Sequence, residues 1–268
     1  LFRSSAASDV YKRQDLDGTL LDRDTFKFDK ISGYLKDLIL EDICIIPNSS
    51  KTRQEIEGFN KELDENLSYV VENGAAIYNL NLINSGFPEK IRLSREIDEI
   101  LKVFENKISN KLISKCKFIK NLDIKKQIKV LGLPKEKIKA SLNREYSIPL
   151  LFEGSKSDKT ELFKSVNDIG LSLQEGGRVI NLCDNVSKSQ AMKNVVKVFK
   201  KVTKEKLLTI GVGDNYNDLD MLKNSDIPCL VFNDKFTLEK ININNCLVSK
   251  KPAPEGWKEV VKLALDKI

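Results

Sequence analysis

Short apolar runs, each followed by polar or acidic residues, constrain the fold of this chain more than any other feature. The runs at 43–46, 69–71, 207–212 and 229–232 predict buried strands. Between them, apolar residues recur at helical spacing in 29–39, behind Asp29 as a predicted N-cap, and in 188–200. Strands that alternate with helices are typical of a parallel sheet covered on both faces. The sequence therefore predicts an α/β fold.

The alternation loosens in the middle of the chain. Residues 82–183 carry longer helical stretches with isolated strand candidates such as 148–152, and the regular pattern resumes after them. A length of 268 residues and a 41% hydrophobic content allow two domains. We therefore predict a core built from 15–81 and 184–268, with 82–183 inserted as a second domain.

The first fourteen residues, LFRSSAASDVYKRQ, do not fit this picture. A buried strand should precede the sequence DLDGT that begins at Asp15, yet serines and charged residues do not make a central strand. We expect residues 1–14 to be a non-native leader that replaces the first strand. The alternative is a natural but polar leader.

The chain has no histidine, which excludes Ser-His-Asp and Cys-His hydrolysis, phosphohistidine chemistry and histidine-based zinc sites. Its five cysteines are scattered singly, a pattern that suits a reducing compartment. No apolar stretch has the length of a membrane span or the form of a signal peptide. We expect a cytoplasmic protein that does not bind a membrane.

Two pairs of acidic residues carry the predicted chemistry. Asp15 and Asp17 lie in DLDGT, and Asp214 and Asp218 lie in GDNYND after the run 207–212. In open α/β folds the carboxyl ends of parallel strands meet at one edge, where ligands bind. Carboxylate and backbone oxygens gathered there suit Mg²⁺. The cation is needed because a carboxylate that approaches a phosphate dianion is repelled by several kcal/mol.

Hydroxyl and ammonium groups for a phosphate are also predicted. Ser49 and Ser50 follow a predicted strand and precede a predicted helix, so their hydroxyls and the helix amides can face phosphate oxygens. Lys188 begins another predicted helix and can add a fixed positive charge. Each residue alone is common as a cap or a surface charge. Their order along the chain, between the two acidic pairs, favours a phosphate site.

At this point the sequence resembles the haloacid dehalogenase superfamily, through DLDGT, Ser49, Lys188 and GDNYND. More narrowly it resembles the mannosyl-3-phosphoglycerate phosphatases, in the motifs NSSKTR at 48–53, VENGAAI at 71–77, REYSIP at 144–149, GGRVINL at 176–182 and PAPEGW at 252–257. The resemblance implies a Rossmann-like core with an inserted α+β cap. It also implies that mannosyl-3-phosphoglycerate is hydrolysed to mannosylglycerate.

The resemblance also implies a role for each motif residue. Asp15 would be the nucleophile that forms an aspartyl-phosphate, and Asp17 the general acid and then base. Ser49, Ser50 and Lys188 would hold the phosphoryl group. Metal binding would fall to Asp15, Asp17 and Asp214, with Asp218 as a ligand or an orienting group.

Residues 102–144 include thirteen basic and three acidic residues. This stretch predicts either a solvated lysine-rich surface or a site that binds a small phosphorylated sugar acid. Nucleic-acid binding is disfavoured, because no known nucleic-acid-binding motif accompanies the positive charge. Arg178 and Arg144 are the candidates for gripping the sugar acid's carboxylate.

Other functions stay open on the sequence alone. They are a capped phosphatase for hexose or sucrose-type phosphates, a phosphomutase and a non-catalytic phospholigand-binding protein.

Overall fold

The computed structural model describes the chain except for residues 1–9, 15–18, 24, 177, 203–206 and 235–242. It divides into two compact units. The first contains 1–49, 60–91 and 187–268, and the second contains 50–59 and 92–186. Among the described residues, each helix is too short or too polar to cross a lipid bilayer.

A five-stranded parallel sheet forms the centre of the first unit, in the order β12-β11-β10-β1-β2. Its strands are β1 (Val10–Gln14), β2 (Cys44–Pro47), β10 (Leu208–Gly213), β11 (Ile227–Leu230) and β12 (Leu247–Val248). Fully buried apolar residues such as Ile46, Ile210 and Val212 explain why the runs predicted as strands adopt this conformation.

The expectation that no central strand lies within residues 1–14 is wrong for Val10–Gln14. β1 pairs with β10 on one side and β2 on the other, with Val10 opposite Leu208 and Gln14 opposite Val212 and Pro47. A strand between two others is held through its backbone donors and acceptors on both edges, so a polar sequence can still complete a ladder.

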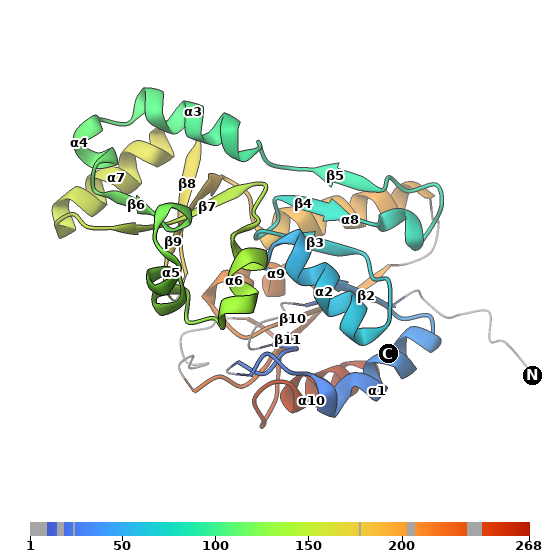
Figure 1. Ribbon diagram of the computed structural model, residues 1–268. Helices are drawn as coiled ribbons and strands as arrows, with labels where there is room; N and C mark the ends of the chain where they lie inside the picture. The colour runs from blue at the N-terminus through green and yellow to red at the C-terminus, as the bar shows by residue number, and fades with distance from the viewer. Residues whose placement is uncertain (1–9, 15–18, 24, 177, 203–206, 235–242) are drawn as a thin grey trace, which may run out of the picture. The chain divides into compact units, whose positions relative to one another are not determined.

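Helices cover both faces of this sheet. Figure 1 shows α1 (Asp29–Leu40) and α10 (Glu255–Leu265) on one face, and α8 (Lys188–Val202) and α9 (Leu219–Lys223) on the other. Asp29 is the first helical residue of α1 rather than its N-cap, which is Phe28. A short 3-10 turn, η3 (Tyr216–Asp218), precedes α9. The layered α/β arrangement predicted from the sequence is therefore present.

The run 69–71 does form a strand, but outside the five-stranded sheet. β3 (Tyr69–Val71) belongs to a separate sheet with β4 (Ala76–Tyr78) and β5 (Lys90–Arg92), in the order β3-β4-β5. β3 and β4 are antiparallel, and one parallel bridge joins Val70 to Asn48 just after β2. The 3-10 turn η1 (Leu80–Leu82) follows β4.

The second unit has an antiparallel sheet in the order β6-β7-β9-β8. Its elements are α3 (Ile97–Lys107), α4 (Asn110–Ile113), β6 (Cys116–Phe118), η2 (Ile119–Asn121), α5 (Ile124–Leu131), α6 (Lys135–Leu142), β7 (Ser147–Phe152), α7 (Lys156–Asp168), β8 (Leu171–Glu175) and β9 (Ile180–Asp184). Most of α2 (Arg53–Leu63) also groups with this unit.

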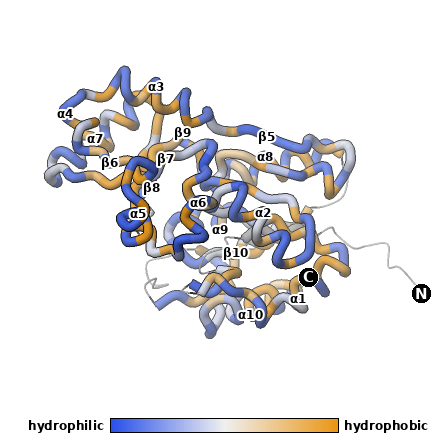
Figure 2. The backbone as a smooth tube through the Cα atoms, viewed as in Figure 1, coloured by the Kyte–Doolittle hydropathy of each residue, from blue (hydrophilic) through white to orange (hydrophobic). Residues whose placement is uncertain are grey.

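Apolar side chains of α3, α7 and the sheet form the core of the second unit. Phe104, Leu150, Leu162 and Leu182 are fully buried in it. Each such side chain contributes about 1.5–3 kcal/mol by leaving water. Figure 2 shows α3 alternating between hydrophobic and hydrophilic segments, as a helix with one buried face does.

Candidate active site

The carboxylate of Asp214 lies at the carboxyl end of β10 and is 2% exposed. Its Oδ1 accepts a hydrogen bond from the Thr19 hydroxyl at 3.0 Å, and its Oδ2 accepts one from Asn233 Nδ2 at 3.0 Å. Asn233 also accepts from Arg23 Nη1 at 2.8 Å. Segments from both ends of the chain therefore fix one buried carboxylate at the edge where open α/β folds bind ligands.

A buried ion pair lies beside it. Lys188, the first residue of α8, is 2% exposed, and its Nζ lies 2.8 Å from Oδ1 of Asp218, which is fully buried. The other carboxylate oxygen of Asp218 accepts from the backbone amides of Asp214, at 3.1 Å, and Asn215, at 3.2 Å. Both oxygens of Asp218 are thus engaged, so this side chain orients the ammonium group and the turn after β10.

A glycine permits this close approach. A Cβ atom added to Gly213 would lie 2.4 Å from the Cβ of Asp218, a distance that real Cβ contacts essentially never show. Gly213, the glycine in GDNYND, therefore lets Asp218, five positions later, pack against the end of β10.

Ser49 is fully buried just after β2, and its backbone ties it to β3. The backbone amide of Ser49 donates a hydrogen bond to the carbonyl of Val70 at 3.1 Å, and the carbonyl of Ser49 accepts one from the backbone amide of Asn73 at 2.9 Å. The neighbouring Asn48, also fully buried, donates through Nδ2 to the carbonyl of Lys188 at 2.9 Å. These contacts join the loop after β2 to the beginning of α8, so the predicted phosphate ligands Ser49 and Lys188 belong to one region of the first unit.

Asp15 and Asp17, the predicted nucleophile and general acid, lie outside the described residues. Within the described ranges, no third His, Cys, Asp or Glu joins Asp214 and Asp218 in a metal-binding group. Thr19, which follows DLDG directly, is the described residue nearest to them in sequence that contacts the site.

The other predicted site residues lie in the second unit. Arg144 Nη1 donates to the carbonyl of Ser50 at 3.3 Å and to the Ser147 hydroxyl at 2.9 Å. The exposed Arg178 donates to the carbonyl of Leu131, the last residue of α5. A guanidinium group at a helix C-terminus satisfies a free carbonyl, which is a stabilising role.

Sequence reasoning missed Thr19, Arg23 and Asn233. Thr19 and Arg23 follow DLDG closely, and Asn233 comes shortly after β11, so a search of every strand end for polar residues would have found them.

The surroundings of Asp214 fit a divalent cation. Burial, which removes water from the charged form, is the largest cause that raises the pKa of Asp214, and the neighbouring Asp218 carboxylate also raises it. Thr19, Lys188 and Arg23 oppose these effects, and the resulting pKa is about 6. A cation bound to Asp214 would offset the cost of keeping this buried carboxylate ionised beside Asp218. Carboxylate oxygens are the ligands that Mg²⁺ prefers, and the hydrogen bonds from Thr19 and Asn233 orient them.

Comparison with known proteins decides the family. The model of the family described as haloacid dehalogenase-like hydrolase matches residues 14–242. The chain belongs to the haloacid dehalogenase-like hydrolases.

Two curated members of similar sequence cover most of the chain. A glucosyl-3-phosphoglycerate/mannosyl-3-phosphoglycerate phosphatase of Persephonella marina is 29% identical over 95% of this chain and 96% of its own length. A protein of the same name from Methanococcoides burtonii is 30% identical over 81% of this chain and 82% of its own length. They confirm the predicted family and the predicted enzyme class, a phosphoric monoester hydrolase.

A solved structure agrees in fold. A phosphatase of the haloalkanoate enzyme superfamily from Bacteroides thetaiotaomicron superposes with a TM-score of 0.68 at 15% identity, over 98% of this chain and 97% of that one. The predicted Rossmann-like core with an inserted cap is therefore the fold of this haloacid dehalogenase-like hydrolase.

Proposed function

We propose that this haloacid dehalogenase-like hydrolase is a magnesium-dependent phosphatase that converts mannosyl-3-phosphoglycerate to mannosylglycerate and phosphate. The observation that carries the proposal is the buried Lys188–Asp218 pair beside Asp214, at the end of β10. The names of the relatives from Persephonella marina and Methanococcoides burtonii support the substrate and add its glucosyl counterpart.

The proposed reaction has two steps. Asp15 attacks phosphorus in line and an aspartyl-phosphate forms, while Asp17 gives its proton to the departing glycerate oxygen. Asp17 then takes a proton from water, whose oxygen attacks phosphorus and breaks the bond to Asp15. Phosphate leaves, and both carboxyl groups return to their starting state.

The described residues stabilise the charge on the phosphoryl group. Lys188 presents an ammonium group that Asp218 holds in one position, so little reorganisation is needed when charge develops. Ser49 would donate its hydroxyl to a phosphate oxygen. Asp214, with Asp15 and Asp17, would hold Mg²⁺, which supplies positive charge against the repulsion between carboxylate and phosphate.

The remaining sequence predictions belong to this proposal. Residues 82–183 would be the cap, with 15–81 and 184–268 as the core. A cytoplasmic location is consistent with five free cysteines among the described residues.

Phosphate release from a substrate panel tests the proposal. The panel contains mannosyl- and glucosyl-3-phosphoglycerate, hexose phosphates, a sucrose-type phosphate and an aryl phosphate, each with Mg²⁺ and with a chelator. We expect Mg²⁺-dependent release that is selective for the glycosyl phosphoglycerates. Equal hydrolysis of the hexose phosphates would overturn the proposed substrate assignment. Full activity in the presence of the chelator would overturn the proposed requirement for Mg²⁺.

A further inference from the structure

The segment that follows β11 brings the side chain of Asn233 to Asp214. The amide of Val231 donates to the carbonyl of Gly213 at 2.9 Å, which continues the pairing of β10 with β11 beyond the two strands. Asn233 comes two residues later, and its Nδ2 lies 3.0 Å from Oδ2 of Asp214 and 3.1 Å from the backbone oxygen of Asp214. One amide group therefore holds both the side chain and the backbone of this aspartate.

A closed loop brings Arg23 to the other end of the same amide. Oδ1 of Asp22 accepts hydrogen bonds from the amide of Thr25 at 2.8 Å and from its hydroxyl at 2.7 Å. The amide of Asp22 donates to the carbonyl of Lys27 at 2.9 Å. Aspartate side chains stabilise tight turns in this way. From this loop, Arg23 Nη1 donates to Oδ1 of Asn233 at 2.8 Å.

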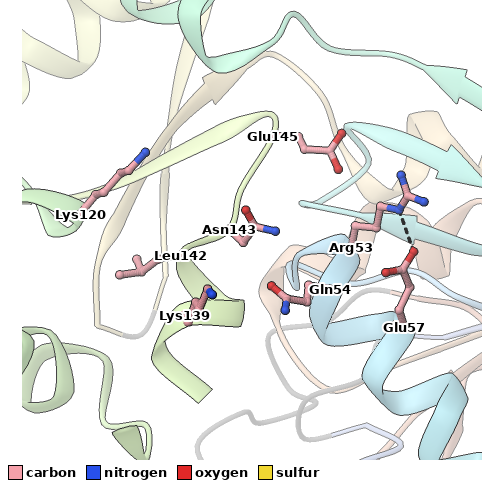
Figure 3. Close-up of a pocket in the computed structure, with 8 residues that line it drawn as sticks. All are labelled: Arg53, Gln54, Glu57, Lys120, Lys139, Leu142, Asn143 and Glu145. Carbon is pink, nitrogen blue, oxygen red and sulfur yellow. Dashed lines mark hydrogen bonds and ion pairs between the residues drawn. The ribbon is translucent and has the colours of Figure 1, made fainter. Parts of the chain in front are cut away.

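Arg23 holds a different kind of group from Arg53, which lines a pocket of about 580 Å³ in the second unit. Figure 3 shows Arg53 beside Glu57, and the distance from Nε to Oε1 is 2.7 Å. There a guanidinium group compensates a carboxylate directly. Arg23 instead donates to a neutral amide, and the NH₂ group of that amide donates to the carboxylate of Asp214. The contact between Arg23 and Asp214 is therefore indirect, through Asn233.

Both neighbours determine the direction of the Asn233 amide. Carboxylate and carbonyl oxygens accept hydrogen bonds, whereas a guanidinium group can only donate them. With its oxygen toward Arg23 and its NH₂ group toward Asp214, the amide satisfies all of these groups. The opposite orientation would bring two donors together at Arg23 and two oxygens together at Asp214. Arg23 thus favours the orientation in which Asn233 donates to Asp214.

We propose that Arg23 and Asn233 are positioning residues for the metal site. Arg23 sets the direction of the Asn233 amide, and Asn233 holds the Asp214 carboxylate in the orientation that binds Mg²⁺. The inference rests on the proposed function, which takes Asp214 as a ligand of Mg²⁺. Loss of a hydrogen bond that orients a metal ligand typically lowers metal affinity by about ten- to a hundredfold.

The test measures binding of the metal alone to the full chain, without substrate. The electron paramagnetic resonance signal of free Mn²⁺ gives the dissociation constant for Mn²⁺, and displacement by Mg²⁺ gives the constant for Mg²⁺. Asn233→Ala should raise both constants about tenfold or more, because it removes the donor to Asp214. Arg23→Met removes one hydrogen bond to Asn233 and should raise them about three- to tenfold. Arg23→Lys keeps a donor and the charge, so it should retain most of the affinity.

The sign of the change separates positioning from charge. A positive charge repels a nearby cation, so the loss of the Arg23 charge by itself would lower the dissociation constants. Lys27→Met is the matched control, because it removes a positive charge from the same loop, which Lys27 joins through its backbone carbonyl. This control should not raise the constants. In the background of Asn233→Ala, Arg23→Met should cause no further rise, because the amide that links Arg23 to Asp214 is already absent.

The fluorescence of Trp257, which is buried in the first unit, shows during urea unfolding that each variant is folded. Arg23 is exposed, so Arg23→Met keeps the test available if Asn233→Ala does not fold.

The outcomes separate this assignment from the proposed function. A wild type that binds neither metal would overturn the proposed requirement for Mg²⁺, and the assignment with it. A wild type that binds Mg²⁺, with constants that are unchanged or lower in Arg23→Met and Asn233→Ala, would overturn the assignment alone. An equal rise in Lys27→Met, or a further rise in the double variant, would also overturn the assignment.

Discussion

Replacing Asp218 with asparagine should destabilise the first unit by about 3–5 kcal/mol. The asparagine oxygen can still accept from the backbone amides of Asp214 and Asn215, but its NH₂ group would face the ammonium group of Lys188. A donor then meets a donor, and the charge of a lysine that is 2% exposed is left without its carboxylate.

The distance sets the scale of this loss. At 2.8 Å and an effective dielectric constant near 20, the attraction between Lys188 and Asp218 is about 6 kcal/mol before desolvation is subtracted. Lys188→Met should cost a similar amount, because it leaves the Asp218 carboxylate buried. The double variant removes both charges, so its cost should fall short of the sum of the two single costs by about 1–3 kcal/mol.

The chain offers a specific probe for this measurement. Its single tryptophan, Trp257, is fully buried in α10 of the first unit. Tryptophan fluorescence during urea unfolding therefore follows the first unit. The midpoint should shift to lower urea while the slope m stays constant.

Two results would contradict a strong interaction between Lys188 and Asp218. One is a loss below about 1 kcal/mol in Asp218→Asn, which is the range of an exposed ion pair. The other is strict additivity in the double variant, which would mean that the two side chains do not interact in solution.

Three further predictions concern stability. Gly74→Ala should lower the free energy of unfolding in urea by more than about 1 kcal/mol, because φ at this position is +105° and the new Cβ would lie 2.2 Å from the carbonyl oxygen of Ser187. An unchanged urea midpoint would contradict this prediction. Burial raises the pKa of Asp184, but hydrogen bonds from Arg95 outweigh it and hold the pKa below its ordinary value. The ionised Asp184 therefore stabilises the fold fully above its unfolded pKa of about 3.9, and the loss of unfolding free energy in Asp184→Asn should shrink as pH falls below about 4. Unfolding followed by circular dichroism measures this loss, and a loss independent of pH would contradict the Arg95–Asp184 ion pair. Arg178→Ala should lower the free energy of unfolding by about 0.5–1.5 kcal/mol, because it removes the hydrogen bond to Leu131, and should change KM little. A large rise in KM would indicate that Arg178 binds the substrate.

The predictable part of the fold is the part with strong side-chain patterns. The apolar run 207–212 and the amphipathic segment 188–200 correspond to β10 and α8, because burial on both faces or on one face leaves a readable period. β1 was missed because its place is defined by backbone pairing with β2 and β10, which a polar sequence does not reveal. The three-residue strand β3 is too short for its pattern to tell one sheet from another.

The sequence predicted which residue types form the candidate active site, but not which of these side chains contact one another. The order of Ser49, Lys188, Asp214 and Asp218 along the chain indicated phosphate and metal chemistry. That Lys188 pairs with Asp218, thirty positions away, follows from tertiary packing that no local pattern contains. The pairing of Arg178 with the end of α5 is of the same kind.

We propose that Asp15 receives the phosphoryl group. Acid quenching of the enzyme during turnover of mannosyl-3-phosphoglycerate, followed by peptide mass spectrometry, tests it directly. We expect a phosphorylated peptide that contains Asp15 in the wild type, and neither the modification nor turnover in Asp15→Asn. A phosphoryl group on a different residue, or near-normal turnover by Asp15→Asn, would contradict it.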